Sequence, residues 1–371
     1  MLRLTNIKLL DGRSVPDIEV FDGSDSYSER DMSGSYAVPG YFDSHIHGSF
    51  GYDVSDGRPD DITELAGKLP SFGVSGFLPT LMTMDENRLL KASEAVSDAQ
   101  RALLTDDLAH AEISGLRLEG PFLNPLKAGV QDPEHLVSAE KFVKIVDKIE
   151  KEFPGLIKLI DIAPELDGAM DIVREYKGKY VMSLAHSDCG YEKAMEFFEN
   201  GGSSLTHALN AMKDCLKRDP GPLGAAFDSQ DSYIEVICDG VHIDKTVLRM
   251  LFKLFEERII VVSDSMRAGG MPEGSYDLGG TCVEVADGRT YFGPSRKLAG
   301  SVTNLAQEAY RLFSYGVPKE SVVNALTSLP RKRLKTDASV IDTDNLNFVD
   351  EEMRLISVIS RGRLVLPYIM L

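Results

Sequence analysis

Short apolar runs alternate with amphipathic stretches through the middle of the chain. Eight apolar runs cover residues 36–46, 76–80, 113–118, 157–163, 180–185, 204–206, 233–238 and 259–263. Stretches with helical spacing lie between them, among them 62–69, 86–104, 139–153, 191–200 and 245–255. Apolar strands that alternate with helices predict a parallel sheet covered by helices. Eight such units fit a closed (β/α)8 TIM barrel, and an open, doubly wound sheet is the structural alternative.

The two ends of the chain read as short β segments. Residues 2–10 and 18–21 are apolar-rich around a turn, and residues 355–359 and 364–366 repeat this pattern at the other end. Because chain termini often lie close together, we expect both ends to form one small β-sandwich domain. This domain would comprise residues 1–37 and 338–371, and the barrel would comprise residues 38–337.

Imidazole and carboxylate side chains follow the apolar runs. They are His45 and His47 on the first run, Glu119 after the third, His186 and His207 after the fifth and sixth, His242 after the seventh and Asp264 after the eighth. The carboxyl ends of barrel strands converge on one mouth, and alternate residues of a strand, such as His45 and His47, point to the same face. Buried imidazoles and carboxylates are costly unless a partner such as a metal ion binds them. The pattern therefore predicts a divalent metal site.

The acidic balance narrows the possible partners. Asp and Glu number 58 against 40 Lys and Arg, giving a net charge of −18 and a pI near 4.9. This charge argues against nucleic acid or an anionic membrane as a partner, since both require a basic surface. No apolar run approaches the roughly 18 residues of a membrane span, the first residues lack signal-peptide features, and the four cysteines form no CxxC pair. We expect a cytoplasmic protein.

Eight segments of the chain resemble a known family. They are PGYFDSHIHG at 39–48, LEGPF at 118–122, AHSD at 185–188, THALNAM at 206–212, DPG at 219–221, DGVHID at 239–244, SDSM at 263–266 and LAGS at 298–301. In this order and spacing they resemble the N-acetylglucosamine-6-phosphate deacetylases of the amidohydrolase superfamily. The resemblance implies a TIM-barrel hydrolase of amino-sugar metabolism that converts N-acetyl-D-glucosamine 6-phosphate to D-glucosamine 6-phosphate and acetate.

The resemblance also implies roles for the residues at the strand ends. The residues that resemble metal ligands are Glu119, His186 and His207, with His45 and His47 completing a second position and Glu119 as a possible bridge. One or two divalent ions are implied; Zn2+ suits these ligands best, and Fe2+ or Mn2+ also fit. Asp264 resembles the catalytic carboxylate, which accepts a proton from water and returns it to the amine nitrogen.

A further set of residues resembles the family's substrate contacts. They are Val130, Gln131, Asn210, Ala211, Arg218, His242, Leu298, Ala299, Gly300 and Ser301. Many relatives carry a histidine where Gln131 stands, and an amide can still donate a hydrogen bond but cannot be charged. Arg218 offers a planar fork of N–H groups suited to phosphate. Since such an arginine can come from the neighbouring subunit in this family, the resemblance implies a homodimer.

Two other functions fit the same residues. One is a sister amidohydrolase of the same mechanism that acts on N-acetylgalactosamine 6-phosphate or, more remotely, on a cyclic amide or an N-acyl amino acid. The other is a non-catalytic, metal-bound barrel that serves as a binding protein. Asp264 argues against the binding protein, because a pure binder needs no base that faces the ion.

Overall fold

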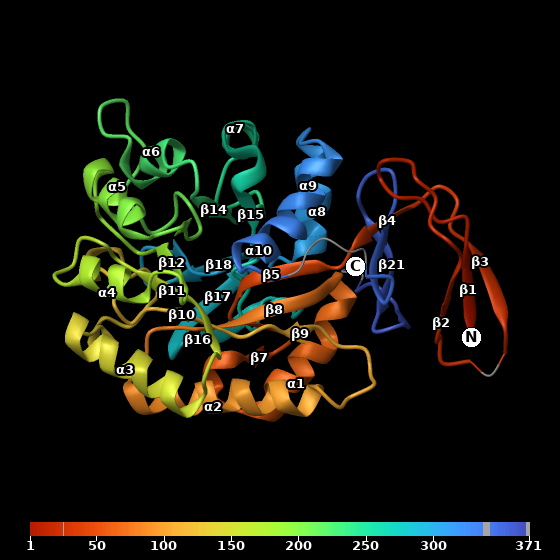
Figure 1. The fold of residues 1–371 in the computed structure, drawn as a ribbon, viewed down its shortest axis with the longest axis horizontal. Coiled ribbons are helices and arrows are strands. Elements are labelled where there is room, and N and C mark those ends of the chain that lie inside the picture. Colours follow the sequence, from red (N-terminus) through yellow and green to blue (C-terminus); the bar gives the residue numbers. More distant parts are fainter. Residues whose placement is uncertain (25, 337–341, 369–371) are drawn as a thin grey trace.

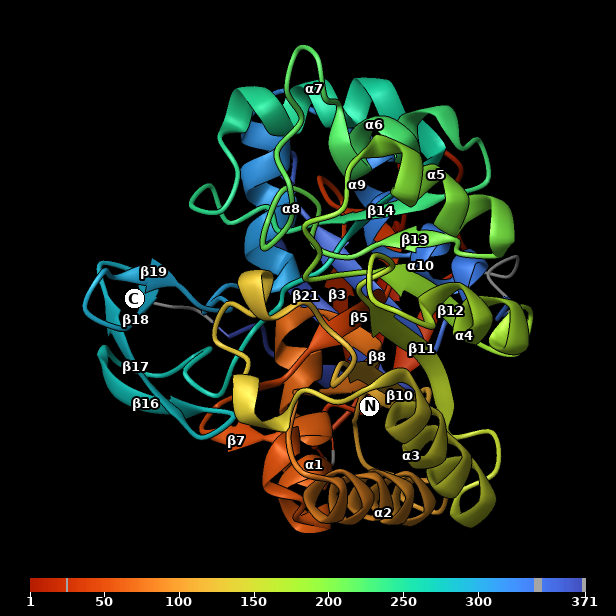
Figure 2. The same cartoon turned by 90° about the vertical axis from the view of Figure 1, so that its left-hand side faces the viewer.

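Eight parallel strands form a barrel at the centre of the molecule (Figures 1 and 2). The computed structural model describes residues 1–24, 26–336 and 342–368. The strands run in the order β15-β14-β13-β12-β11-β10-β8-β5, with the short β9 (Glu112–Ile113) beside β8. Their bounds are β5 Tyr41–Ile46, β8 Val74–Leu81, β10 Leu116–Glu119, β11 Ile157–Ile162, β12 Val181–Leu184, β13 Ser204–Leu205, β14 Tyr233–Val236 and β15 Ile259–Val261. The barrel prediction is confirmed.

Helices connect the strands and cover the outside of the barrel (Figure 2). They are α1 Pro59–Lys68, α2 Glu86–Leu103, α3 Ala139–Glu152, α4 Ala169–Tyr176, α5 Tyr191–Asn200, α6 Gly221–Asp228, α7 Lys245–Phe255, α8 Leu305–Ser314, α9 Lys319–Leu326 and α10 Ser328–Arg333. Short 3-10 helices cover Val54–Asp56, Leu69–Phe72, Pro125–Lys127, Pro133–His135 and Glu256–Arg258. Several helices begin at a polar N-cap, such as Asp85 before α2 and Asn304 before α8, whose side chains accept backbone N–H groups.

The barrel closes between its first and last strands through a loop. Beyond β15, the Asp264 N–H donates to the His45 carbonyl (2.9 Å), and the His47 N–H donates to the Ser265 carbonyl (2.9 Å). Ile46 and Ser265 form a parallel bridge at the same place. The segments that join the two edges of the sheet are therefore the segments that carry three of the candidate metal and catalytic residues.

Both ends of the chain build a small β sandwich beside the barrel, on the right in Figure 1. One sheet has the order β2-β1-β3 and the other β22-β21-β20-β4. Their bounds are β1 Leu2–Thr5, β2 Ile18–Val20, β3 Ser28–Asp31, β4 Tyr36–Pro39, β20 Asn345–Val349, β21 Leu355–Ser360 and β22 Arg363–Val365. Leu4 from the first sheet and Phe348 from the second share one fully buried core, which confirms the sandwich formed from both termini.

The apolar run at residues 36–46 divides between the two parts of the structure. Residues 36–39 form β4, which pairs with β20 of the sandwich, and residues 41–46 form β5 of the barrel. Gly40 lies between them, where an added Cβ would lie 2.4 Å from the Cβ of Ser75. The expectation of one continuous strand is wrong. The domain boundary between residues 37 and 38 stays a prediction and falls inside β4, and the boundary between 337 and 338 lies outside the described residues.

An antiparallel sheet is inserted between β15 and α8, on the left in Figure 2. It comprises β16 Gly274–Leu278, β17 Thr281–Ala286, β18 Arg289–Phe292 and β19 Lys297–Leu298, and a small hairpin of β6 Gly48–Ser49 and β7 Tyr52–Asp53 follows β5. The inserted sheet packs Leu278 and Val283 against Met82 and Met266 of the barrel mouth. Residues 268–270 pack against the hairpin, where the Phe50 N–H donates to the Gly269 carbonyl.

No helix in the described ranges is long and apolar enough to cross a lipid bilayer.

We expect Phe348→Ala to destabilise the protein by about 3–5 kcal/mol, because it removes a fully buried ring from the core between the two terminal sheets. Chemical unfolding of the metal-free chain, followed by circular dichroism, measures the change. Ile356→Ala is the control: its side chain lies on β21 and is 44% exposed, so its loss should stay within about 0.5 kcal/mol. Equal effects of the two changes would contradict a shared core.

Candidate active site

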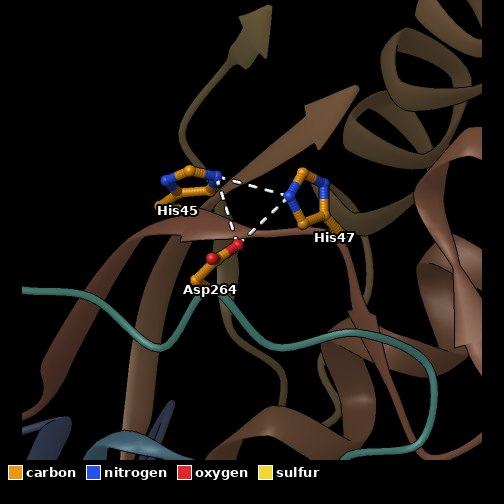
Figure 3. A group of neighbouring side chains, drawn as sticks. All are labelled: His45, His47 and Asp264. Atoms are coloured by element: carbon orange, nitrogen blue, oxygen red, sulfur yellow. Dashed lines mark hydrogen bonds and ion pairs between the residues drawn. The ribbon is translucent and has the colours of Figure 1, made fainter. Parts of the chain in front are cut away.

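His45, His47 and Asp264 converge at the barrel mouth (Figure 3). The Nε2 atoms of the two histidines lie 3.3 Å apart, and Asp264 Oδ1 lies 3.5 Å from His45 Nε2 and 3.3 Å from His47 Nε2. The histidines come from the end of β5 and the aspartate from the loop after β15. All three residues are buried, so this group presents two imidazole nitrogens and a carboxylate oxygen to one point.

Glu119, His186 and His207 form a second group beside the first. Glu119 Oε1 lies 3.1 Å from His186 Nε2 and 3.2 Å from His207 Nε2, and the two imidazole nitrogens lie 3.2 Å apart. Glu119 also faces the first group, with 3.4 Å from Oε1 to His45 Nε2 and 3.3 Å from Oε2 to His47 Nε2. The structure therefore brings together all six predicted residues, with Glu119 between the two groups.

Three of these residues adopt a left-handed backbone conformation. The φ angles are 43° at His186, 29° at His207 and 47° at Asp264. A non-glycine residue in this region costs on the order of 1–3 kcal/mol and persists only where the surrounding structure enforces it. Such strain often marks functional sites, and here it turns side chains from three different strand ends toward one centre.

Backbone carbonyls fix the orientation of two imidazoles. His47 Nδ1 donates to the Thr80 carbonyl (3.1 Å), and His186 Nδ1 donates to the Lys127 carbonyl (2.8 Å). Because a carbonyl can only accept, each of these hydrogen bonds assigns a proton to Nδ1, so the neutral form of each ring has its lone pair on Nε2. Both Nε2 atoms face the centre of the site, and in the neutral form they can bind a metal ion there.

The carboxylates and imidazoles shift one another's pKa values. Burial opposes a charge on His45, but Asp264 and Glu119 outweigh it and raise the pKa of His45 to about 9. Burial likewise opposes ionisation of Asp264, yet His45 and His47 lower its pKa to about 2. The pKa of Glu119 is also lowered well below its usual value, against burial, by His45, His186 and His207. Both carboxylates are therefore anionic at neutral pH.

This donor set fits a divalent cation. Imidazole nitrogens lie within 3.3 Å of each other in each group, and lone pairs at that distance repel unless a positive charge lies between them. The two carboxylates add two negative charges in a buried place, which burial alone makes unfavourable. Nitrogen and oxygen ligands, which come here from five strand ends, are typical of catalytic metal sites. The six residues would hold one or two ions.

A cavity of about 250 Å³ opens onto these groups. The predicted substrate contacts that line it are Val130, Gln131, Asn210, Ala211, His242, Leu298, Ala299 and Gly300. Among them, His242 is held by Asp239: its Nδ1 lies 2.8 Å from Asp239 Oδ2, and its backbone N–H donates to Oδ1. Although burial opposes the charge, this contact raises the pKa of His242. His242 therefore offers the cavity a polar group in a fixed position.

Two predicted contacts lie outside the cavity lining. Ser301 is buried, its hydroxyl donates to the Ser263 carbonyl (2.5 Å), and its N–H donates to the Asp264 carbonyl (2.7 Å). Ser301 therefore stabilises the loop that carries Asp264. Arg218 is exposed on the loop between β13 and α6 and does not line the cavity of its own chain.

Gln131 contacts a candidate metal ligand in addition to lining the cavity. Its Nε2 donates to Glu119 Oε2 (2.5 Å), and its Oε1 accepts the Thr83 N–H (2.7 Å). The amide is buried, and these two bonds fix which end faces Glu119. Gln131 therefore holds Glu119 in place, and a direct contact with substrate at this position stays a prediction.

Sequence reasoning missed several residues of the site. Met82, Gly129, Leu209 and Leu278 also line the cavity. A set of buried charges inside the barrel was missed as well: Arg117, Asp161 and Glu235 are fully buried in strands that otherwise read as apolar. A charged residue inside an apolar barrel strand was the signal that could have identified them, and Arg117 stands two residues before Glu119 on the same face.

Comparisons with known proteins give a consistent result. No protein-family model matches the sequence. The N-acetylglucosamine-6-phosphate deacetylase of Bacillus subtilis is 30% identical over 343 residues, which are 89% of this chain and 84% of the relative. The N-acetylgalactosamine-6-phosphate deacetylase of Escherichia coli O157:H7 is 30% identical over 84% of this chain and 81% of the relative. The solved N-acetylglucosamine-6-phosphate deacetylase of Thermotoga maritima has a TM-score of 0.80 at 26% identity, with 98% of each chain covered.

We expect a divalent cation to displace protons when it binds to the metal-free protein. With a pKa raised to about 9, His45 carries a proton at neutral pH that the cation must replace, so affinity should increase as the pH rises toward 9 and decrease as it falls. Titration calorimetry of Zn2+ in buffers with different heats of ionisation measures the protons released. Binding heats that do not depend on the buffer would contradict this expectation.

Proposed function

The chain belongs to the N-acetylglucosamine-6-phosphate deacetylase family, and on that premise we propose that it hydrolyses the acetamide of N-acetyl-D-glucosamine 6-phosphate. The products are D-glucosamine 6-phosphate and acetate. One observation carries the proposal: the Asp264 carboxylate faces His45 and His47 at the mouth of the barrel, beside the group formed by Glu119, His186 and His207.

Asp264 is the proposed general base and acid. A divalent cation, when bound, acidifies water and polarises a carbonyl oxygen. The Asp264 carboxylate accepts a proton from the attacking water as the new C–O bond forms. It then passes this proton to the nitrogen as the C–N bond breaks, so that the amine leaves as a neutral group and not as an anion. The low pKa of Asp264 ensures that the carboxylate is free to accept the proton at neutral pH.

The donor set supports Zn2+ as the cation. Each group contains two imidazoles and one carboxylate, a combination that zinc accepts in catalytic sites and that Fe2+ and Mn2+ also accept. Two groups of three ligands that share a neighbouring carboxylate support two ions per chain. Elemental analysis of the purified protein measures both the metal and its number, and fewer than one ion per chain in an active sample would contradict the mechanism.

The phosphate of this substrate has no lysine or arginine partner among the described residues that line the cavity. A phosphate is normally bound by such groups, so the missing charge must come from beyond the lining. We infer that the protein acts as a homodimer in which Arg218, exposed on its loop, reaches the cavity of the neighbouring subunit.

A free-thiol state of all four cysteines fits a cytoplasmic location.

One relative is named for the galactosamine epimer, so the test of the proposed function must compare both substrates. The Escherichia coli protein named N-acetylgalactosamine-6-phosphate deacetylase is as similar in identity as the Bacillus subtilis one. An acetate-release assay on both N-acetylated hexosamine 6-phosphates, on unphosphorylated N-acetylglucosamine, and with a chelator present separates these functions. Activity on the glucosamine epimer that the chelator abolishes supports the proposal, and absence of that activity in the metal-loaded protein contradicts it.

We expect Asp264→Asn to lower kcat by at least about 10²–10⁴-fold, because an amide cannot accept the proton from water. Acetate release measures the loss, and elemental analysis should show that the position formed by Glu119, His186 and His207 keeps its metal. Asp171→Asn is the control, because Asp171 lies on α4 with its side chain 85% exposed. Retained turnover in Asp264→Asn would remove this residue from the mechanism.

We expect Arg218→Ala to raise KM for the phosphorylated sugar and to be complemented by Asp264→Asn in mixed dimers. In a mixed dimer the Arg218→Ala subunit keeps its own Asp264 and receives Arg218 from its neighbour, so one of the two sites is restored. At a substrate concentration where neither variant alone has appreciable activity, equal mixing of the two should recover about a quarter of wild-type activity. No recovery after subunit exchange, or a KM effect on the unphosphorylated sugar of the same size, would contradict a phosphate contact across the dimer.

A further inference from the structure

A layer of buried charges lies inside the barrel beneath the candidate metal ligands. It consists of Arg117 on β10, Asp161 on β11, Glu235 on β14 and Arg333 at the end of α10. Arg117 Nε and Nη2 donate to the two oxygens of Asp161 at 2.7 and 2.9 Å. Two guanidinium groups and two carboxylates balance in charge, which is the condition for keeping ions in a dry interior.

Glu235 lies between this layer and the metal site. Its Oε1 accepts from Arg117 (2.7 Å) and from Arg333 (2.6 Å), and its Oε2 accepts from Arg117 Nη2 (2.9 Å). On the other side, Oε2 lies 3.7 Å from Nδ1 of His45. Both residues are fully buried, so bulk water does not compete for this contact.

His45 differs from His47, the other histidine of its group, in how its ring is held. Its Nε2 faces His47 and Asp264, so binding a cation there requires a lone pair on Nε2 and a proton on Nδ1. Backbone carbonyls accept the Nδ1 proton of His47 and of His186. In the described part of the chain, His45 Nδ1 is buried and makes no hydrogen bond, and the Glu235 carboxylate is the acceptor that faces it.

We propose that Glu235 is a positioning residue for the metal position formed by His45, His47 and Asp264. When that position holds a cation, the carboxylate accepts a hydrogen bond from Nδ1 of His45, which fixes the ring and strengthens Nε2 as a ligand. Arg117 and Arg333 keep the Glu235 carboxylate in place and ionised. Glu235 thus determines how tightly this position binds its ion, and the inference rests on the proposed metal-dependent function.

The effect should be confined to one of the two positions. Glu235 faces His45, while the second position is formed by Glu119, His186 and His207, and the Nδ1 proton of His186 has its own backbone acceptor. A residue that merely stabilises the barrel would weaken both positions together. The affinities of the two positions can therefore separate positioning from general structural support.

The test is metal binding by Glu235→Gln, which keeps the shape of the side chain and removes its charge. Metal-free protein is titrated with Zn2+ in competition with a chromophoric chelator, and bound metal is counted. We expect one of two positions to weaken by about 10–100-fold and the other to keep its wild-type affinity. Glu235→Asp, which retains the charge, should lose less affinity than Glu235→Gln and serves if the glutamine variant folds poorly.

Asp161→Asn is the matched control. It removes the charge of a fully buried partner of Arg117 in the same layer, yet within the described residues none of the Asp161 hydrogen bonds involves a metal-ligand side chain. Two positions of wild-type affinity in Glu235→Gln would overturn the proposal, as would an equal loss in Asp161→Asn. Wild-type protein that binds no cation would instead overturn the proposed function, so the two failures are distinguishable.

Discussion

The structure depends on one electrostatic constraint: imidazole lone pairs and two carboxylates meet in a buried place at the mouth of a barrel. Such a convergence is unfavourable without a positive charge at its centre. Several features of the surrounding structure keep these side chains together. His186, His207 and Asp264 adopt a strained backbone, Gln131 holds Glu119, and the loop after β15 joins β5 beside His45. A divalent cation makes these arrangements mutually consistent, because it replaces the protons that otherwise occupy the imidazoles.

Periodicity predicted the barrel, with an open sheet as the alternative, because each strand is a short apolar run, and imidazole or carboxylate side chains lie at the ends of six of the eight runs. It also placed the six ligand candidates, since strand ends converge in this fold whatever the loops do. Periodicity failed where consecutive apolar residues belong to two different sheets, because both sheets favour the same residue types. Residues 36–46 read as one strand although Gly40 ends the sandwich sheet and begins the barrel. The inserted sheet was missed even though Asp287-Gly288 between β17 and β18 is a typical hairpin signal.

Side-chain partners were the part that sequence could not supply. Gln131 was expected to face the substrate, and only the fold shows that its amide lies between Thr83 and Glu119. Asp161 and Glu235 stand 44 and 118 residues from Arg117 along the chain, and the closed barrel is what brings their side chains to the Arg117 side chain. Only the three-dimensional structure shows that the described residues of the cavity lining include no lysine or arginine. A phosphate contact by the exposed Arg218 therefore requires a second chain.

The closure of the ring has a consequence for heat inactivation. β5 and β15 are joined by a few loop hydrogen bonds, whereas neighbouring strands elsewhere are joined by parallel ladders. The seam of the barrel, where β5 meets the loop after β15, therefore coincides with the candidate active site. Any opening of the seam separates His45 from Asp264 before it disturbs the other strands. Warming should inactivate the enzyme while its helical circular-dichroism signal is still intact. A tightly bound ion should delay this inactivation, because its ligands come from both edges of the sheet.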